Sequence, residues 1–381
     1  MRKLLVITFI AVISAGFLAV VFRAPAERSA VEGRVYAKLS APSLSDIRGF
    51  IGNTSNAFAD QIPFRDGLTR LYYSALRAIG MDTVDGFVFG GDEYIYHANL
   101  TFRDFDAEKA EALKHAAGML NEAAALAAAY GGRFIFMPTP LKTAADTENL
   151  PSWYGGNTEY QLALAGAWAG ALSRGVTFID LLPAFTAAEH PCFLKTDHHW
   201  NIRGAHIAYE SVMSLTRELF PQVEAYGPEK YIIEKEVNVG FYNRRLGMSA
   251  RPEPEELVIY PDGWAVPYTR YESGKISELP VYNNKDMDAR ASYAGYMSGD
   301  FAETKIETNR PELPSIMIIG DSQTNLLELF CIPSFDSMTS LDFRYSPPLD
   351  TLLEYIERDR PDIIVVTFRI DTTDMAAVLH S

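Results

Sequence analysis

The stretch IMIIGDSQ, residues 316–323, joins a short apolar run to a glycine, an acid and a serine. Four apolar residues before a glycine are typical of a buried strand, and the apolar spacing that follows over 324–330 predicts a helix. A serine at this junction lies at the carboxyl end of a strand, where open α/β sheets place their reactive groups. The stretch therefore predicts an α/β fold with Ser322 at one edge of the sheet.

The rest of the chain alternates apolar runs of strand length with stretches of helical periodicity. Strand–helix–strand units of this length are typical of parallel crossovers, so we expect a mostly parallel sheet flanked by helices. Residues 221–310 break the pattern with tyrosines, prolines and charges, and are expected to form a β-rich insertion. The expected strands are 133–137, 176–180, 316–319 and 363–368; the expected helices are 56–80, 106–130, 158–173, 203–220, 324–330 and 349–357; a hairpin is expected over 84–96.

Residues 1–23 are expected to be a signal anchor or a signal peptide. Two basic residues precede an uncharged apolar run over 4–22, which as a helix would extend about 28 Å, close to the thickness of a bilayer core. The basic start orients the N-terminus toward the cytoplasm, so the remainder is expected to be exported. Small residues at 24–26 make signal-peptide cleavage, and hence secretion, the alternative.

Length and charge limit the possible functions and the domain organisation. The chain has 381 residues, 48% of them hydrophobic, and a formal net charge of −15. Such an acidic chain is a poor candidate for binding nucleic acid, which relies on Lys and Arg to neutralise phosphates. We expect a polar tether over 24–45 and one large domain over 46–381, with the insertion inside it.

A second segment, TDHHWN at residues 196–201, supplies an acid and two imidazoles within three positions. A serine hydroxyl becomes a nucleophile when a histidine accepts its proton and an aspartate orients that histidine. Because side chains two apart share one face of an extended segment, Asp197 is expected to pair with His199, with His198 facing the other side. Ser322, His199 and Asp197 are therefore the candidate triad, and an ordinary N-cap serine is the plain alternative.

A metal site is the competing interpretation of the histidine-rich region. His190, Asp197, His198, His199 and His206 lie within seventeen residues, and such side chains suit zinc or manganese. The helical His-Glu-x-x-His arrangement is absent from the sequence. We expect no metal and no cofactor, and keep a metal-dependent hydrolase as the alternative.

The start of the helix after the serine provides candidates for the oxyanion site. Backbone N–H groups at a helix N-terminus are suited to a developing oxyanion. We assign this role to the N–H of Ser322 together with Gln323, and Asn325 is a weaker candidate.

Three further side chains are candidates for contact with substrate. Trp200 is expected either to line a sugar or acyl pocket or to pack in the core. Arg344 and Tyr345 follow the serine by about one strand–helix–strand step, so they should return to the same edge of the sheet. An ion pair between Arg344 and Asp342 is the structural alternative.

Two cysteines, Cys192 and Cys331, lie near the two candidate segments. In an exported protein they could form a disulfide that links these segments. Two buried free thiols are the equally open alternative.

Several segments together resemble the DHHW protein family. They are KTDHHWN at 195–201, GDS at 320–322, DQIPFRD at 60–66, VFGGDEYIY at 88–96 and LDFRY at 341–345. This family is similar to the SGNH-hydrolase-like domains of bacterial alginate O-acetyltransferases. The resemblance extends over about residues 35–375 and implies an SGNH-like fold.

The resemblance also implies site residues and an activity. The family's Asp-x-His-Trp pattern maps onto Asp197, His199 and Trp200, and its nucleophile maps onto Ser322. Such proteins move an acetyl group, supplied by a membrane-bound O-acyltransferase, onto a polysaccharide hydroxyl outside the cytoplasmic membrane. We therefore expect an extracytoplasmic O-acetyltransferase of a cell-envelope polysaccharide. An O-acetyl esterase and a non-catalytic glycan-binding assembly protein are the alternatives, because we find no separate carbohydrate-binding module.

Overall fold

A computed structural model describes residues 2–29, 31–39, 41, 45–98, 105–259, 266–282, 291–345 and 349–371. Its α-helices are α1 (Arg2–Phe22), α2 (Ile47–Asp60), α3 (Arg65–Ala78), α4 (Ala107–Ala129), α5 (Lys142–Ala145), α6 (Thr158–Ala171), α7 (Leu182–Thr186), α8 (Ile202–Leu219), α9 (Phe241–Arg245), α10 (Thr324–Cys331) and α11 (Leu349–Asp359). Its strands are β1 (Thr83–Val84), β2 (Phe87–Phe89), β3 (Ile95–His97), β4 (Arg133–Phe136), β5 (Val176–Phe178), β6 (Ile232–Glu236), β7 (Glu255–Ile259), β8 (Thr269–Glu272), β9 (Lys275–Ser277), β10 (Glu303–Glu307), β11 (Ser315–Gly320), β12 (Ser337–Asp342) and β13 (Ile363–Thr367). Short 3₁₀ helices are η1 (Gly91–Glu93), η2 (Pro228–Lys230), η3 (Tyr293–Gly295) and η4 (Ile332–Ser334).

The main sheet has the strand order β5-β4-β13-β11-β12-β10-β8-β9. The strands from β5 to β12 pair in parallel, whereas β10, β8 and β9 extend the sheet by antiparallel pairing. The carboxyl ends of β4, β13, β11 and β12 therefore meet at one edge. This arrangement confirms the expected α/β fold with a mostly parallel sheet.

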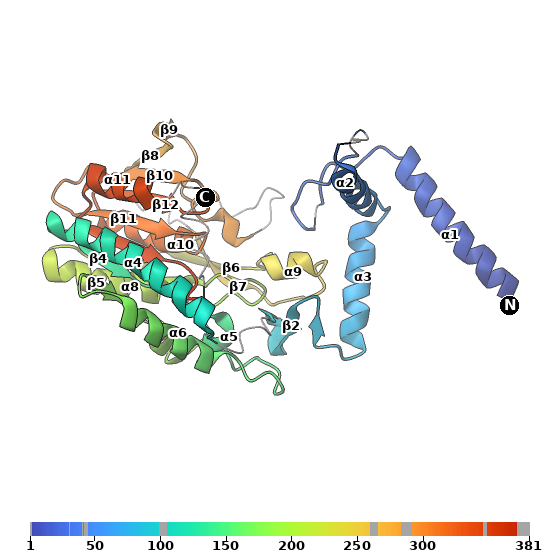
Figure 1. The fold of residues 1–381 in the computed structure, drawn as a ribbon, viewed down its shortest axis with the longest axis horizontal. Helices are drawn as coiled ribbons and strands as arrows, with labels where there is room; N and C mark the ends of the chain where they lie inside the picture. Colours follow the sequence, from blue (N-terminus) through green and yellow to red (C-terminus); the bar gives the residue numbers. More distant parts are fainter. Residues whose placement is uncertain are drawn as a thin grey trace. The chain divides into compact units, whose positions relative to one another are not determined.

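Helices cover both faces of this sheet (Figure 1). Along β11, Ile316 and Ile318 pack into the core beneath α8 and α10, and Met317 and Ile319 pack into the core beneath α4, α6 and α11. Successive side chains of a strand point to opposite faces, so a continuous apolar run is what a strand buried on both faces requires.

The chain divides into two compact units, which are described separately. One comprises residues 1–85 and 241–251, and the other comprises 86–240 and 252–381. The main sheet and both of its helix layers lie in the second unit. This division differs from the single domain expected over 46–381, because α2 and α3 pack with the N-terminal residues.

The first unit contains α1, which is the one helix, among the residues that the structure describes, long and apolar enough to cross a membrane. Its window Lys3–Val20 has a mean hydropathy of 2.4. The following segment is not a free tether as expected. Ser29 is fully buried, with its hydroxyl donating to Asp66, and Arg34 binds Asp60. Polar side chains thus fold part of 24–45 onto α2 and α3.

The expected insertion over 221–310 splits into two parts. Strands β6 and β7 form a separate antiparallel pair, whereas β8, β9 and β10 join the main sheet. Residues 260–265 and 283–290 of the insertion lie outside the described residues. Strand β12 was absent from the expected elements, and the expected helix over 56–80 begins at Arg65, after the separate helix α2.

Candidate active site

Ser322 lies two residues beyond β11 and two residues before α10, whose N-cap is Gln323. A Cβ atom on Gly320 would come within 2.1 Å of the carbonyl oxygen of Thr367 on β13. Only glycine allows this close approach of the two backbones, and the chain can then turn from the strand into the helix. Ser322 itself is partly exposed. The turn therefore places its hydroxyl at the carboxyl edge of the sheet.

The segment with the two histidines forms a tight loop beside this turn. Phe193 pairs with Trp200 as an antiparallel bridge, and the Leu194 N–H donates to the His199 carbonyl oxygen at 3.1 Å. The loop is followed by α8, whose N-cap residue Asn201 accepts hydrogen bonds from two backbone N–H groups of the first turn. Both ends of the loop are thus fixed by hydrogen bonds.

The loop brings a histidine to the serine across 123 positions of sequence. His199 Nε2 lies 2.9 Å from Ser322 Oγ, and His199 Nδ1 lies 2.8 Å from Asp197 Oδ1. Both distances are within hydrogen-bond range. The three expected residues therefore form a continuous carboxylate–imidazole–hydroxyl chain, the arrangement that activates a serine for nucleophilic attack.

Asp197 is buried and remains a carboxylate. Burial favours the neutral acid, but the two neighbouring imidazoles outweigh it and hold the pKa of Asp197 well below its usual range. An ionised acceptor at Nδ1 fixes the tautomer in which His199 Nε2 carries a lone pair toward the serine. The electrostatics therefore match a histidine that accepts the hydroxyl proton.

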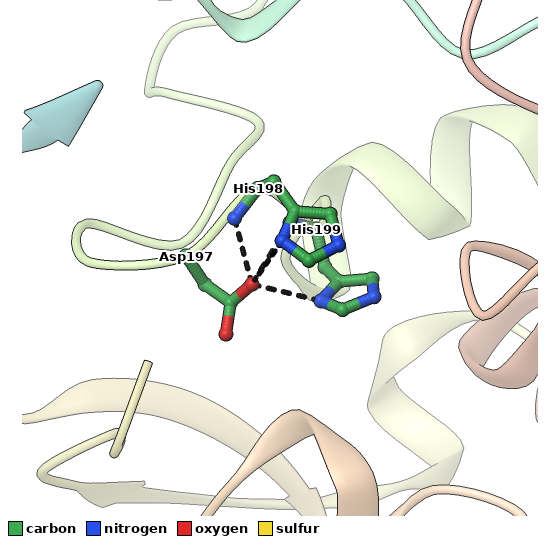
Figure 2. A group of neighbouring side chains, drawn as sticks. All are labelled: Asp197, His198 and His199. Carbon is green, nitrogen blue, oxygen red and sulfur yellow. Dashed lines mark hydrogen bonds and ion pairs between the residues drawn. The ribbon is translucent and has the colours of Figure 1, made fainter. Parts of the chain in front are cut away.

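The expectation that His198 faces away is wrong. Its Nδ1 lies 3.1 Å from Asp197 Oδ1, and its ring centroid lies 3.9 Å from that of His199. Figure 2 shows both rings converging on the same carboxylate oxygen, which also accepts the His198 N–H at 2.6 Å. The segment is a tight turn around Asp197, so the alternation of an extended strand does not apply to it.

A buried lysine fixes this loop by hydrogen bonds to its backbone. Lys142 Nζ donates to the carbonyl oxygens of Leu194, Lys195 and Asp197 at 2.6–3.0 Å, and to Ile95 at 2.9 Å. Its ammonium also lies over the rings of Tyr94 and Tyr96. Burial lowers the pKa of Lys142 to about 8, so the group is protonated at neutral pH. Three N–H donors shared among four carbonyls set the position of the Asp197 backbone.

A tyrosine connects the imidazole to the helix that follows the serine. The Tyr293 ring is parallel to that of His199, with centroids 3.8 Å apart and an interplanar angle of 4°. Its hydroxyl donates to the Gln323 carbonyl oxygen at 3.0 Å. Tyr293 therefore limits the tilt of the imidazole relative to the nucleophile.

Two substitutions of Tyr293 separate these contributions. Tyr293→Phe keeps the stacked ring and loses the two hydrogen bonds of the hydroxyl, one to the Gln323 carbonyl oxygen and one from the Leu326 N–H. Because the ring beneath His199 stays, we expect ester turnover to fall less than about fivefold. Tyr293→Leu also removes the flat surface beneath His199, and we expect a fall of about fiftyfold, since small displacements of catalytic groups are costly. Steady-state rates with a chromogenic acetyl ester measure both; equal losses would show that stacking on His199 does not matter.

The expected oxyanion residues are engaged in other contacts. The Gln323 N–H donates to Asp321 Oδ1 at 2.9 Å, and its side-chain amide donates to the His198 carbonyl oxygen at 3.3 Å. Asn325 donates to Asp300 at 2.9 Å. Neither residue is therefore positioned as expected. Of the three groups expected to bind the oxyanion, the Ser322 N–H is the one that these contacts do not occupy.

The three residues expected to contact substrate differ in burial and in their partners. Trp200 is fully buried in the core, so of the two positions expected for it core packing is correct and the pocket wall is not. Arg344 returns to the same edge, since the Phe343 N–H donates to the Gly320 carbonyl oxygen at 3.0 Å. Its guanidinium pairs with Asp342 and Asp300, as the structural alternative predicts. Tyr345 is exposed next to it.

A metal ion has one candidate position among the described residues. Asp197, His198 and His199 offer ligand atoms within 4.8 Å of one another. However, the Nδ1 atoms of both rings already contact the Asp197 carboxylate, and His199 Nε2 contacts the serine. His206 lies elsewhere, on α8, against Phe330. The donor set is thus arranged for proton transfer to the serine rather than around a shared centre.

Cys192 and Cys331 are buried free thiols. Burial raises the pKa of Cys192 to about 12, so the thiol stays protonated. The disulfide considered from the sequence is therefore not formed, and the free-thiol alternative is correct.

A buried acid in α10, the helix that follows Ser322, makes the stability of the protein depend on pH. Glu328 accepts hydrogen bonds from Thr324 and Ser340, and burial raises its pKa to about 7. The folded chain then binds more protons than the unfolded chain between about pH 4.5 and 7, so this group lowers the stability as the pH rises through that window.

Glu328→Gln should remove this dependence. We expect the variant to gain about 2–3 kcal/mol of unfolding free energy relative to the parent between pH 5 and pH 8. Denaturant unfolding at a series of pH values measures the difference, with the exposed substitution Glu357→Gln as the control. A parallel pair of curves for Glu328→Gln and the parent would contradict the assignment.

The fold and this site define a class of protein. It is an SGNH-hydrolase-like α/β fold with a serine, a histidine and an aspartate in contact at the carboxyl edge of its sheet. Residues 87–262 match the family model described as the SGNH hydrolase-like domain of the acetyltransferase AlgX. The matched range contains Asp197 and His199 and ends before Ser322. The chain is thus similar to SGNH-like acetyltransferases, which confirms the resemblance seen in the sequence.

Solved structures share the fold. A DHHW family protein from Eubacterium siraeum is 21% identical with a TM-score of 0.60, covering 78% of this chain and 96% of that one. PatB1 from Bacillus cereus, solved with a sulfonyl adduct, is 20% identical with a TM-score of 0.60, covering 77% of this chain and 97% of that one. None of the curated protein sequences compared with the chain matches it.

Proposed function

We propose that this protein is a serine-dependent O-acetyltransferase that acts on a cell-envelope polysaccharide outside the cytoplasmic membrane. The observation that supports it most is the unbroken chain of contacts from Asp197 through His199 to Ser322, at 2.8 and 2.9 Å. The similarity to SGNH hydrolase-like acetyltransferase domains supports acetyl as the transferred group. The apolar helix α1 supports a membrane-anchored location.

In the first half-reaction, Ser322 Oγ attacks the carbonyl carbon of an acetyl ester and His199 Nε2 takes the hydroxyl proton. Asp197 stabilises the resulting imidazolium, and the Ser322 N–H donates to the oxyanion. The C–O bond to the donor alcohol then breaks, and His199 gives its proton to that leaving oxygen. The product is acetyl-Ser322 and a neutral histidine.

In the second half-reaction a sugar hydroxyl takes the place of the donor alcohol. Its oxygen attacks the acetyl carbonyl while His199 Nε2 takes its proton. The bond to Ser322 Oγ breaks, and the serine oxygen recovers a proton from His199. The step therefore regenerates the free enzyme and needs no cofactor; a membrane-bound O-acyltransferase is the proposed source of the acetyl donor.

Transfer is tested by supplying both substrates. The full chain is incubated with a chromogenic acetyl ester and cell-wall or capsular oligosaccharides, and the sugars are analysed by mass spectrometry. Acetylated sugars support the proposal. Free acetate as the sole product would indicate an esterase, and polysaccharide binding without any turnover would indicate an assembly protein. Inactivation by a chelator would instead indicate the metal-dependent hydrolase.

A further inference from the structure

Helix α3 exposes apolar side chains on the side that faces away from the rest of its own unit. Arg70 and Arg77 donate to the carbonyl oxygens of Gly247 and Ser249 within the same unit, at 3.1 and 3.0 Å. The opposite side of the helix carries exposed apolar residues at helical spacing, of which Leu71 is 66% exposed and Ile79 is 74% exposed. This apolar stripe consists of Phe64, Leu68, Leu71, Tyr72 and Ile79. An amphipathic helix with this orientation needs an apolar environment outside its own unit.

The start of α3 is tied to the end of α1 by a very short connection. Ala26 N–H donates to Gln61 Oε1 at 2.8 Å, and Gln61 Nε2 donates to the Ala26 carbonyl oxygen at 2.9 Å. Gln61 lies in the turn between α2 and α3, and α1 ends at Phe22. Four residues span at most about 14 Å. Wherever α1 leaves a bilayer, the turn between α2 and α3 must therefore lie near the surface.

A ring contact gives the depth of the neighbouring helix. Phe58 of α2 stacks on Phe17 of α1, with centroids 5.8 Å apart. Phe17 lies five residues before Phe22, where the apolar run and α1 end, which is about 8 Å along the helix axis. Interfacial helices insert their apolar sides about 5–10 Å into the boundary between headgroups and acyl chains. The contact places α2 at that depth.

The charge of this unit has the sign that a bacterial membrane surface attracts. Residues 24–85 and 241–251 contain ten basic and seven acidic side chains, a net charge of +3, whereas the whole chain has −15. Basic segments next to a membrane-spanning helix are attracted to anionic lipids. The positive charge of the chain is thus concentrated in the unit that carries the stripe.

We propose that α2 and α3 lie in the membrane interface beside α1, with the apolar stripe among the lipid headgroups and upper acyl chains. The partner of this surface is the bilayer itself. The anchor is then a three-helix element rather than a single spanning helix. The inference requires α1 to remain in the membrane, and it does not depend on the catalytic proposal.

Site-specific fluorescence on the full chain tests the proposal. Leu71→Cys on the stripe is compared with Ser74→Cys, an exposed position on the same helix outside the stripe. The native cysteines are fully buried, so an environment-sensitive dye attaches to the new thiol alone. The labelled chains are reconstituted into phosphatidylethanolamine–phosphatidylglycerol vesicles and quenched with a lipid carrying a nitroxide near the headgroup, or with aqueous iodide.

We expect lipid quenching to be at least about threefold stronger at position 71 than at position 74, with iodide showing the reverse order. Equal access of iodide to both positions would overturn the proposal. A dye at position 71 that neither quencher reaches would also overturn it, because another protein surface would then cover the stripe. Reactivity of Ser322 toward a sulfonyl fluoride, measured on the same samples, reports separately on the active site.

Discussion

We expect Ser322→Ala to lower the turnover of a chromogenic acetyl ester by about 10³-fold or more, to a residual rate that comes from substrate binding and the oxyanion donor alone. The substitution removes the hydroxyl group alone. His199 Nε2 lies 2.9 Å from this hydroxyl and then has no proton to accept from it. Because Ser322 is partly exposed, the substitution leaves no large buried cavity. The thermal midpoint should therefore stay close to that of the parent.

Ser315→Ala is the matched control for this loss. Ser315 begins the same strand that ends before Ser322, and its hydroxyl donates to Asp362 at 2.8 Å. Its removal should cost about 1 kcal/mol of stability with turnover unchanged. If Ser322→Ala retained the parent's rate while the control behaved as expected, the nucleophile would have to be another residue.

We expect Lys142→Met to lower kcat/KM by about 100-fold, since small displacements of catalytic groups are costly, with a much smaller effect on stability. Removing the ammonium takes one hydrogen bond from each of four carbonyl oxygens, a loss of about 1 kcal/mol each. The Lys195 carbonyl keeps the Ile95 N–H as a donor at 2.9 Å. The same change removes a buried charge whose burial lowers the pKa of Lys142 from 10.5 to about 8, equivalent to about 3 kcal/mol. These two effects nearly cancel in the free energy of unfolding. The position of the Asp197–His199 loop still changes, because the loop loses the hydrogen bonds from Lys142 that fix it.

Lys195→Met is the matched control. Lys195 lies in the same loop, but its ammonium pairs with Asp92, whose side chain is mostly exposed, and exposed pairs contribute 0 to about 1 kcal/mol. We expect the control to keep both activity and stability. A large loss of stability in Lys142→Met with an unchanged kcat/KM would show that the lysine supports the fold without positioning the triad.

The nucleophile could be predicted because its position follows from local rules. An apolar run ending in Gly320 and leading into a helix places Ser322 at a strand end, and the structure has both elements within a residue of the expected limits. The pairing of Asp197 with His199 was expected as well, but from an extended segment that the structure does not have. Hydrogen bonds to the Asp197 carboxylate fold the segment into a turn, and in this turn both histidines contact the same oxygen.

The residues that support the site depend on contacts between distant segments. Lys142 follows β4, and its position at the carboxyl edge was a possible signal, but its four acceptors come from two other parts of the chain. Tyr293 lies in a region without periodicity, and nothing in the sequence marks it as the neighbour of His199. Part of the expected tether is likewise folded by the pairing of Arg34 with Asp60, which composition alone does not reveal.

The most direct test of the central claim is the reaction of the full chain with a sulfonyl fluoride, followed by peptide mass spectrometry. Sulfonyl fluorides modify serines that a neighbouring base has activated. We predict a single adduct on Ser322 in the parent, formed about 100-fold more slowly in His199→Ala. An adduct on a different residue, or equal rates of Ser322 modification in the parent and in His199→Ala, would contradict the proposed triad.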